Sequence, residues 1–161
     1  MRRGADPREL ELVYRERFSD FARLAFAITR DEELAREAVQ ETFARALRSR
    51  ESFRREGTVE AWLWSILVNV ARSSRPRPLM QFEYVDWDGP TAPELVARDG
   101  DFGRWVAALP ERQRLAVFLR YWVDLDYRTI AAVLDVEIGT VSATLNAAHA
   151  NLRKALKEVS S

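Results

Sequence analysis

Apolar residues recur every three or four positions through two long stretches of this chain. In the first stretch the recurring residues include Phe18, Phe21, Leu24 and Ile28. In the second they include Leu115, Phe118, Leu119 and Trp122. This spacing places the apolar side chains on one face of a helix. The pattern therefore predicts an all-α protein with two small helical domains.

A proline-containing stretch separates the two helical patterns. Residues 75–100 contain four of the six prolines and two of the six glycines, and no apolar period persists through them. This composition is typical of a linker. We expect one domain over residues 1–75, an extended linker over 76–100 and a second domain over 101–161. The whole chain has no net charge, but residues 76–103 hold six acidic and two basic residues, so the linker is acidic.

The first domain is expected to contain three helices. Two amphipathic helices lie between Leu10 and about Arg50, interrupted at residues 30–33, where acidic residues suit the positive end of the second helix. After a polar break at 52–57, a very apolar helix begins near Val59 and stops before Pro76. We expect one of its two tryptophans, at 62 and 64, to point inward and the other to reach a surface.

The second domain is expected to contain a short helix over 102–109, a helix from Glu111 to about Val123, a third over 127–134 and a final long helix. Pro110 suits the first turn of the second helix, and Asp126 is a candidate cap for the third. A tight turn at 135–137 precedes the last helix, which begins at 139 or 140. A short helix, a brief turn and a longer helix are typical of a helix-turn-helix DNA-binding motif. A plain helical hairpin gives the same pattern.

Composition argues against several other classes of function. Cysteine is absent, which excludes a disulfide framework, a thiolate zinc site and a cysteine nucleophile. The first residues lack the apolar run of a secretory signal, and no stretch of about 18 apolar residues occurs, so we expect a cytoplasmic protein without membrane insertion. His149 lacks ligand companions, and neither a nucleotide-binding loop nor a Ser-His-Asp set is present. We expect no metal, no cofactor and no enzymatic activity.

Two motif sets resemble one family. The sequences LPERQRLAVFLRY from Leu109 and LDYRTIAAVL from Leu125, followed by a Gly-Thr-Val from Gly139, resemble region 4 of the extracytoplasmic-function sigma factors of the sigma-70 family. Independently, DEELAREAVQETF from Asp31 and AWLWSILVNVA from Ala61 resemble region 2 of the same family and the helix that follows it. The resemblance covers about residues 10–73 and 102–157, in the family's order.

The resemblance implies an initiation factor that directs RNA polymerase to promoters. Its implied partners are core RNA polymerase, through the beta-prime clamp helices and the beta flap, promoter DNA and an anti-sigma factor. Implied polymerase-binding residues are Asp31, Glu37, Gln40, Glu41 and Arg45. Those implied for the -10 element are Phe53, Arg54, Arg55, Trp62, Asn69, Arg72 and Arg75. Those implied for the -35 element are Arg112, Arg114, Arg128, Thr140, Ser142, Thr144, Asn146, His149 and Arg153.

The last helix departs from the family pattern. Relatives usually carry several basic residues there, whereas this chain has none between Thr140 and Arg153, and each missing cation removes a phosphate contact. Glu137 stands where relatives often have Ser, and Asp135 where Gly is common. Two alternatives therefore stay open: a diverged regulator that binds polymerase or an anti-sigma factor but recognises promoters weakly, and a one-component DNA-binding regulator.

Overall fold

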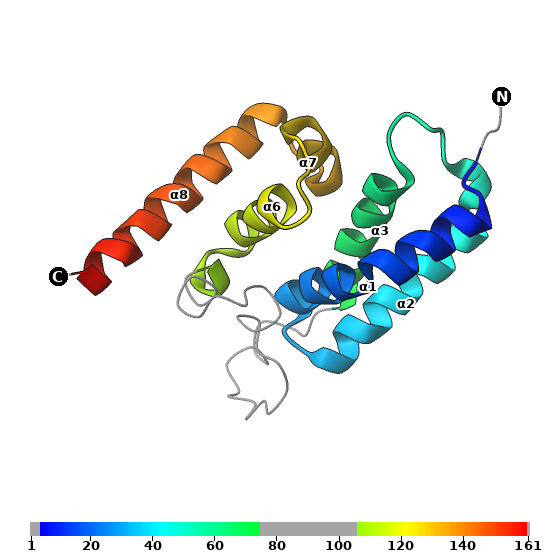
Figure 1. The fold of residues 1–161 in the computed structure, drawn as a ribbon, viewed down its shortest axis with the longest axis horizontal. Helices are drawn as coiled ribbons and strands as arrows, with labels where there is room; N and C mark the ends of the chain where they lie inside the picture. Colours follow the sequence, from blue (N-terminus) through cyan, green and yellow to red (C-terminus); the bar gives the residue numbers. More distant parts are fainter. Residues whose placement is uncertain (1–3, 75–105, 161) are drawn as a thin grey trace. The chain divides into compact units, whose positions relative to one another are not determined.

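A computed structural model describes residues 4–74 and 106–160 of the chain, with side chains to residue 158. The chain divides into two compact units, Met1–Glu83 and Tyr84–Ser161 (Figure 1). Every regular element in the described part is a helix, which confirms the expected all-α class with two helical domains. Arg75, the expected linker and the first half of the expected short helix over 102–109 lie outside the described residues.

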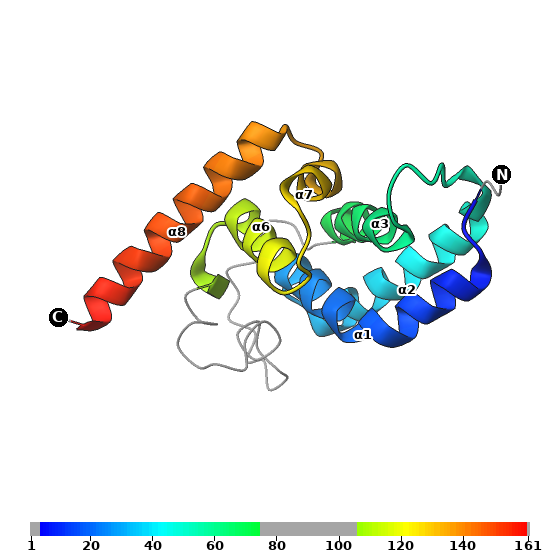
Figure 2. The same ribbon diagram turned by 45° about the horizontal axis from the view of Figure 1, so that its top comes forward.

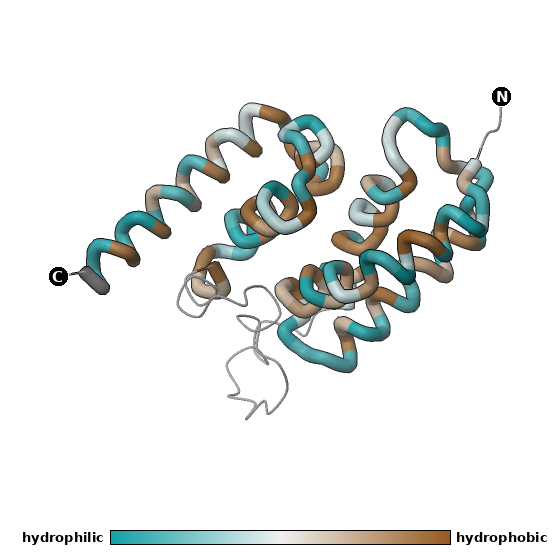
Figure 3. The backbone as a smooth tube through the Cα atoms, viewed as in Figure 1, coloured by the Kyte–Doolittle hydropathy of each residue, from teal (hydrophilic) through white to brown (hydrophobic). Residues whose placement is uncertain are grey.

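The described part of the N-terminal unit contains three α-helices and one short 3-10 helix: α1 (Pro7–Thr29), α2 (Glu32–Arg48), η1 (Arg50–Ser52) and α3 (Val59–Ser74). Each of the α-helices packs against the other two (Figure 2). Apolar residues recur between polar ones along all of them (Figure 3). The largest fully buried side chains of this unit belong to Phe21, Leu24, Val39, Leu63, Trp64, Leu67 and Val68.

The chain reverses between α1 and α2 where the sequence predicted a break. Arg30 ends α1 in the left-handed region with φ 55°. Asp31 then caps α2, because its carboxylate accepts a hydrogen bond from the backbone N–H of Leu34 at 2.9 Å. Such a cap satisfies one of the free N–H groups at a helix start.

The two tryptophans of α3 have different environments, as predicted. Trp64 is fully buried, and its ring stacks on Phe21 with centroids 3.9 Å apart and planes 5° apart. Trp62 is half-buried, with its ring centroid 5.1 Å from that of Phe53. The inward tryptophan is therefore part of the core, and the outward one lies at its edge.

The C-terminal unit contains α6 (Glu111–Tyr121), α7 (Tyr127–Leu134) and α8 (Ile138–Ser160). Residues 106–108 are also helical, and α6 begins directly after Pro110, as expected. Two boundaries differ slightly from the prediction: α6 ends two residues earlier, and α8 begins one residue earlier. All three helices pack against one another. The fully buried large side chains are those of Leu115, Phe118, Leu119, Ile130 and Leu145.

Both ends of α7 are fixed by local hydrogen bonds. The Asp126 carboxylate accepts from the N–H of Thr129 at 2.7 Å, and hydrogen bonds from the Thr129 side chain and backbone lower the pKa of Asp126. At the other end, Asp135 adopts φ 55°. The N–H of Val136 bonds the carbonyl of Ala131 at 2.9 Å, and that of Asp135 bonds Ala132 at 3.3 Å. This pair of bonds is the Schellman motif, which usually has glycine at the left-handed position.

Glycine at position 135 is expected to raise the free energy of unfolding of the C-terminal unit. An L-residue in the left-handed region carries a steric cost that glycine avoids, and the greater freedom of glycine in the unfolded chain offsets part of the gain, leaving roughly 0.5 kcal/mol. Urea unfolding followed by circular dichroism measures the change. Asp135→Asn is the control for charge, since Asn tolerates the same conformation. If Asp135→Gly were less stable than the wild type, the left-handed conformation of Asp135 would carry no steric cost that glycine relieves.

Candidate nucleic-acid interface

Helices α7 and α8 meet at a steep angle through a short turn. The bend between them is 99°, and residues 135–137 connect them. Ala131, a small residue 6% exposed, lies on the packed side of α7. Two helices at about 90–120°, joined by three or four residues, have the geometry of a helix-turn-helix motif. In that motif the second helix enters the major groove, with its N-terminal residues nearest the bases.

The first turns of α8 present short polar side chains. Val141, Leu145 and Ala148 are buried and fix the inner side of the helix. Away from them, Asn146 is exposed, and the side chains of Thr140, Ser142 and Thr144 are half-buried. Such groups donate and accept hydrogen bonds at base edges, but they neutralise no phosphate.

Three of the four candidate arginines of this unit are exposed. Arg112, Arg128 and Arg153 all reach the surface. Arg114 does not: it is 4% exposed, and its guanidinium donates to the backbone carbonyls of Leu109 at 2.9 Å and Ala107 at 3.3 Å. The expected contact of Arg114 with the -35 element is therefore wrong, because its side chain is buried and its hydrogen bonds hold the turn before α6.

Two polar pairs join α6 to α8 beyond the first turns of α8. Tyr121 Oη and His149 Nε2 are hydrogen-bonded at 2.8 Å, and Asn151 Nδ2 donates to Gln113 Oε1 at 2.8 Å. His149 is half-buried and belongs to this contact between helices. Gln113 and Asn151 lie 38 residues apart, so no local pattern in the sequence could have paired them.

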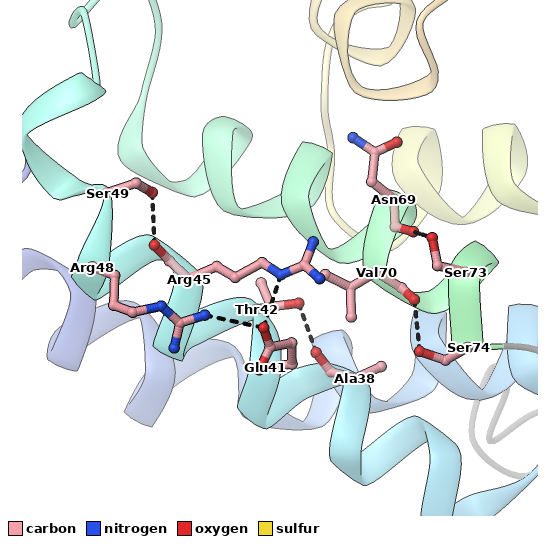
Figure 4. Close-up of polar contacts among 10 residues, drawn as sticks. All are labelled: Ala38, Glu41, Thr42, Arg45, Arg48, Ser49, Asn69, Val70, Ser73 and Ser74. Carbon is pink, nitrogen blue, oxygen red and sulfur yellow. Dashed lines mark hydrogen bonds and ion pairs between the residues drawn. The ribbon is translucent and has the colours of Figure 1, made fainter.

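The outer side of α2 carries the candidate protein-binding residues. Glu37, Gln40 and Arg45 are exposed, and Glu41 is half-buried. Glu41 accepts hydrogen bonds from Arg45 Nε at 2.8 Å and from Arg48 at 3.1 Å (Figure 4). The hydrogen bond from Arg45 is the largest cause of the lowered pKa of Glu41. Arg48 was missed by the sequence analysis, although its spacing of seven residues from Glu41, two helical turns, places it on the same side.

Asp31 and Leu47 stand apart from these charged residues. Asp31 is half-buried, and its carboxylate is engaged as the cap of α2, so its first role is structural. Leu47 is an apolar residue that is 46% exposed, and it follows Gln40 by seven residues on the same side of α2. Leu47 fits the apolar period of the helix, so its exposure could not be predicted from the sequence.

The loop before α3 and the outer side of α3 carry the other candidates. Arg54 and Arg55 are exposed, and both terminal nitrogens of Arg55 donate to the Glu9 carboxylate, at 2.8 and 3.2 Å. On α3, Trp62 is half-buried and Asn69 exposed, and their spacing of seven residues puts them on one side of the helix. Arg72 is half-buried one turn after Asn69.

Phe53 differs from the expectation. Its side chain is 6% exposed, and its ring lies against Trp62. A ring that holds an unstacked base must offer a face to it, so the expected contact of Phe53 with the -10 element is wrong. The physical reason is that the loop folds Phe53 back onto α3, while the neighbouring Arg54 stays exposed.

Residues 4–74 and 106–160 contain no group of three or more His, Asp or Glu side chains placed to hold a metal ion. No single helix of that part is long and apolar enough to cross a membrane. Helices α7 and α8 reach that length and apolarity only when taken together across their 99° bend.

Comparison with known proteins identifies both units. Residues 13–77 match the family model of sigma-70 region 2, and residues 101–158 match that of sigma-70 region 4. The chain is 30% identical to the RNA polymerase sigma factor SigV of Bacillus subtilis over 130 residues, which cover 78% of each protein. It is 32% identical to the sigma factor EcfG of Rhodopseudomonas palustris over 136 residues, 80% of this chain and 74% of that relative.

A solved structure agrees with this assignment. The sigma factor RpoE of Bartonella quintana, crystallised with the anti-sigma factor NepR, superimposes with a TM-score of 0.71 and 26% sequence identity. The match covers 93% of this chain and 95% of that one.

Proposed function

Because this chain belongs to the extracytoplasmic-function sigma factors of the sigma-70 family and directs RNA polymerase to promoters, we propose that its two units divide promoter recognition between them. Residues 1–75 bind core polymerase and open the -10 element. Residues 101–161 bind the -35 element, and residues 76–100 connect the two. The protein acts by binding and catalyses no reaction of its own.

The C-terminal unit reads the -35 element through the first turns of α8. The observation that supports this role is the 99° bend between α7 and α8, with polar side chains on the free side of α8. Thr140, Ser142, Thr144 and Asn146 contact base edges. Arg112, Arg128 and Arg153 contact phosphates, which fix the register of the protein on DNA without reading sequence.

The N-terminal unit binds polymerase through α2 and DNA through α3. Glu37, Gln40 and Arg45, with the half-buried Glu41, form the surface that contacts the beta-prime clamp helices. Their alternating charge suits a polar protein surface.

DNA binding in this unit uses the outer side of α3 and the loop before it. Trp62 and Asn69 lie on one side of α3 and hold the unpaired -10 strand, since an aromatic ring and an amide both suit an unstacked base. Arg54 and Arg72, with Arg75 beyond the described part, bind phosphates of the strand.

Two further partners follow from the same assignment. The acidic composition of residues 76–100 suits a basic channel in polymerase, where carboxylates take the place of nucleic-acid phosphates. Because RpoE of Bartonella quintana forms a complex with the anti-sigma factor NepR, we also propose that an anti-sigma factor binds this chain. The sigma factor itself acts in the cytoplasm, where polymerase is found.

Run-off transcription with core polymerase tests the proposed function. Promoters selected from genomic DNA by the reconstituted holoenzyme should give discrete products that core polymerase alone does not make. A chain that binds core polymerase yet yields no promoter-dependent product on any selected template would overturn it.

A regulator with feeble promoter recognition is the second candidate, favoured by the absence of basic residues from Thr140 to Asn151 on α8. Ala147 is exposed on α8, so Ala147→Arg adds a phosphate contact. We expect tighter holoenzyme binding to the -35 element and a salt dependence steeper by about 1 in log–log slope. Ala147→Gln, with a long uncharged side chain, is the control and should leave the slope unchanged. A slope unaltered by Ala147→Arg would place this face of α8 away from DNA and favour the second candidate.

A further inference from the structure

The start of the chain is fastened to the loop between α2 and α3. The backbone N–H of Gly4 donates to the carbonyl of Phe53 at 3.0 Å, and that of Ala5 donates to the carbonyl of Arg50 at 2.8 Å. Gly4 has φ +91°, and a Cβ placed on it would lie 2.9 Å from the Arg50 carbonyl oxygen. Only glycine fits this close approach without strain.

A second contact joins the first turn of α1 to the same loop. The Glu9 carboxylate receives two hydrogen bonds from the Arg55 guanidinium, 46 residues away in the sequence, at 2.8 and 3.2 Å. Bidentate pairs of this kind fix geometry as well as supplying energy. The same guanidinium also lies over the buried ring of Phe53, with 5.7 Å between the Arg55 Cζ atom and the ring centroid.

Arg55 is also held in an unusual backbone conformation. Its φ angle is 58°, in the region that residues other than glycine rarely adopt. Such a conformation persists where surrounding contacts impose it, and the contacts here are those with Glu9 and Phe53. The neighbouring Arg54 stays exposed. Of the two exposed arginines of the loop, Arg55 is therefore held by Glu9 at the protein surface.

We propose that Glu9 is a positioning residue for promoter opening. Glu9 holds Arg55, and Arg55 fixes the loop over residues 53–58. The fixed loop keeps Arg54, and Trp62 on the adjoining helix α3, facing the -10 strand. This proposal rests on the assignment of the N-terminal unit to the -10 element. The segment Gly4–Glu9 then supports the -10 interface without contacting DNA. Arg55 holds the conformation of the loop and does not bind a phosphate.

Glu9→Gln separates the ion pair from the other role of Glu9. Glu9 also accepts a hydrogen bond from the N–H of Asp6 at 2.9 Å, which completes the capping box of α1. Glutamine supports a capping box as glutamate does, so the substitution keeps the cap and removes the charge that holds Arg55. Glu11→Gln is the matched control, because Glu11 lies on the same helix and pairs at 2.8 Å with Arg15 on an exposed face.

The experiment measures three steps with the holoenzyme: binding of core polymerase, binding to duplex promoter, and opening of the -10 element by permanganate reactivity of its thymines. Glu9→Gln should slow opening by roughly two- to fivefold, the range of an exposed ion pair, leave the other two steps unchanged and lower the melting temperature by no more than about a few degrees. Glu11→Gln should match the wild type at every step. Gly4→Ala, which displaces the chain start from the loop, should show the same defect in opening together with a lower melting temperature, because a Cβ at this position strains the backbone.

A double-mutant cycle with Arg55→Gln completes the test. If Glu9 acts through Arg55, Arg55→Gln alone has the same defect and the double variant is no worse than either single one. Faster opening by Glu9→Gln would overturn the proposal, since Arg55 would then be a phosphate contact restrained by Glu9. Opening equal to the wild type in Glu9→Gln would overturn it as well. A wild-type holoenzyme that opens no promoter would instead refute the proposed function itself.

Discussion

Replacing Trp64 by alanine is expected to unfold the N-terminal unit, whereas the same change at Trp62 leaves it folded and impairs promoter opening. Trp64 is fully buried and stacked on Phe21 at 3.9 Å. Removal of such a ring costs about 3–5 kcal/mol through lost burial and the cavity that remains. This is comparable with the whole stability of a small domain. Urea unfolding followed by circular dichroism should show that part of the helical signal is already lost in the absence of urea.

Trp62→Ala is the matched control on the same helix. Because Trp62 is half-buried, its loss should cost far less stability, and the variant should still bind core polymerase. Opening of the -10 element, read by permanganate reactivity, should fall by roughly tenfold, because a stacked base is worth about 1–3 kcal/mol. Equal destabilisation by the two substitutions, with equal loss of opening, would contradict the separate roles of the two rings.

Replacing Arg114 by alanine is expected to destabilise the C-terminal unit by about 2–3 kcal/mol. Hydrogen bonds from a charged donor are worth about 1.5–3 kcal/mol, and buried carbonyls left without a donor add a penalty. The Arg114 guanidinium donates to the carbonyls of Ala107 and Leu109 from a buried position. Without the Arg114 side chain, the turn before α6 loses its hydrogen bonds to the helix. Thermal and urea unfolding of the full chain measure the change.

Arg112→Ala is the control for Arg114, two positions away and exposed. It should leave stability within about 0.5 kcal/mol of the wild type. Its effect should appear in DNA binding, as a log–log salt dependence shallower by about 1 for one lost phosphate contact. A stable Arg114→Ala variant whose salt dependence changed like that of Arg112→Ala would restore Arg114 to the DNA surface.

Helix boundaries could be predicted because their causes are local. Asp31 and Asp126 each accept a hydrogen bond from an N–H three residues later, and Pro110 directly precedes α6. Capping residues and proline act within one turn of themselves. The sequence therefore contains the signal in the immediate neighbourhood of each boundary. For the two tryptophans of α3 the sequence predicted only that one points inward, and the structure shows that it is Trp64.

The positions of the arginine side chains were harder to predict, because a charged residue is usually expected at the surface. Arg114 precedes Phe118 by four residues and so lies on the buried side of α6, a signal that the helical period contained. The roles of Phe53 and Arg55 had no such signal. Both depend on contacts with residues at the start of the chain, and contacts between distant segments leave no periodic trace in a single sequence.

The two polar pairs that join α6 to α8 have a consequence for how such proteins diversify. Tyr121–His149 and Gln113–Asn151 anchor the second half of α8, beyond the polar positions from 140 to 146. The exposed positions of the first half are therefore free to accept substitutions without loosening the anchor. Under the proposed assignment of these positions to base edges, descendants of this chain can acquire a different target sequence through a few replacements there, while the remainder of the domain stays as it is.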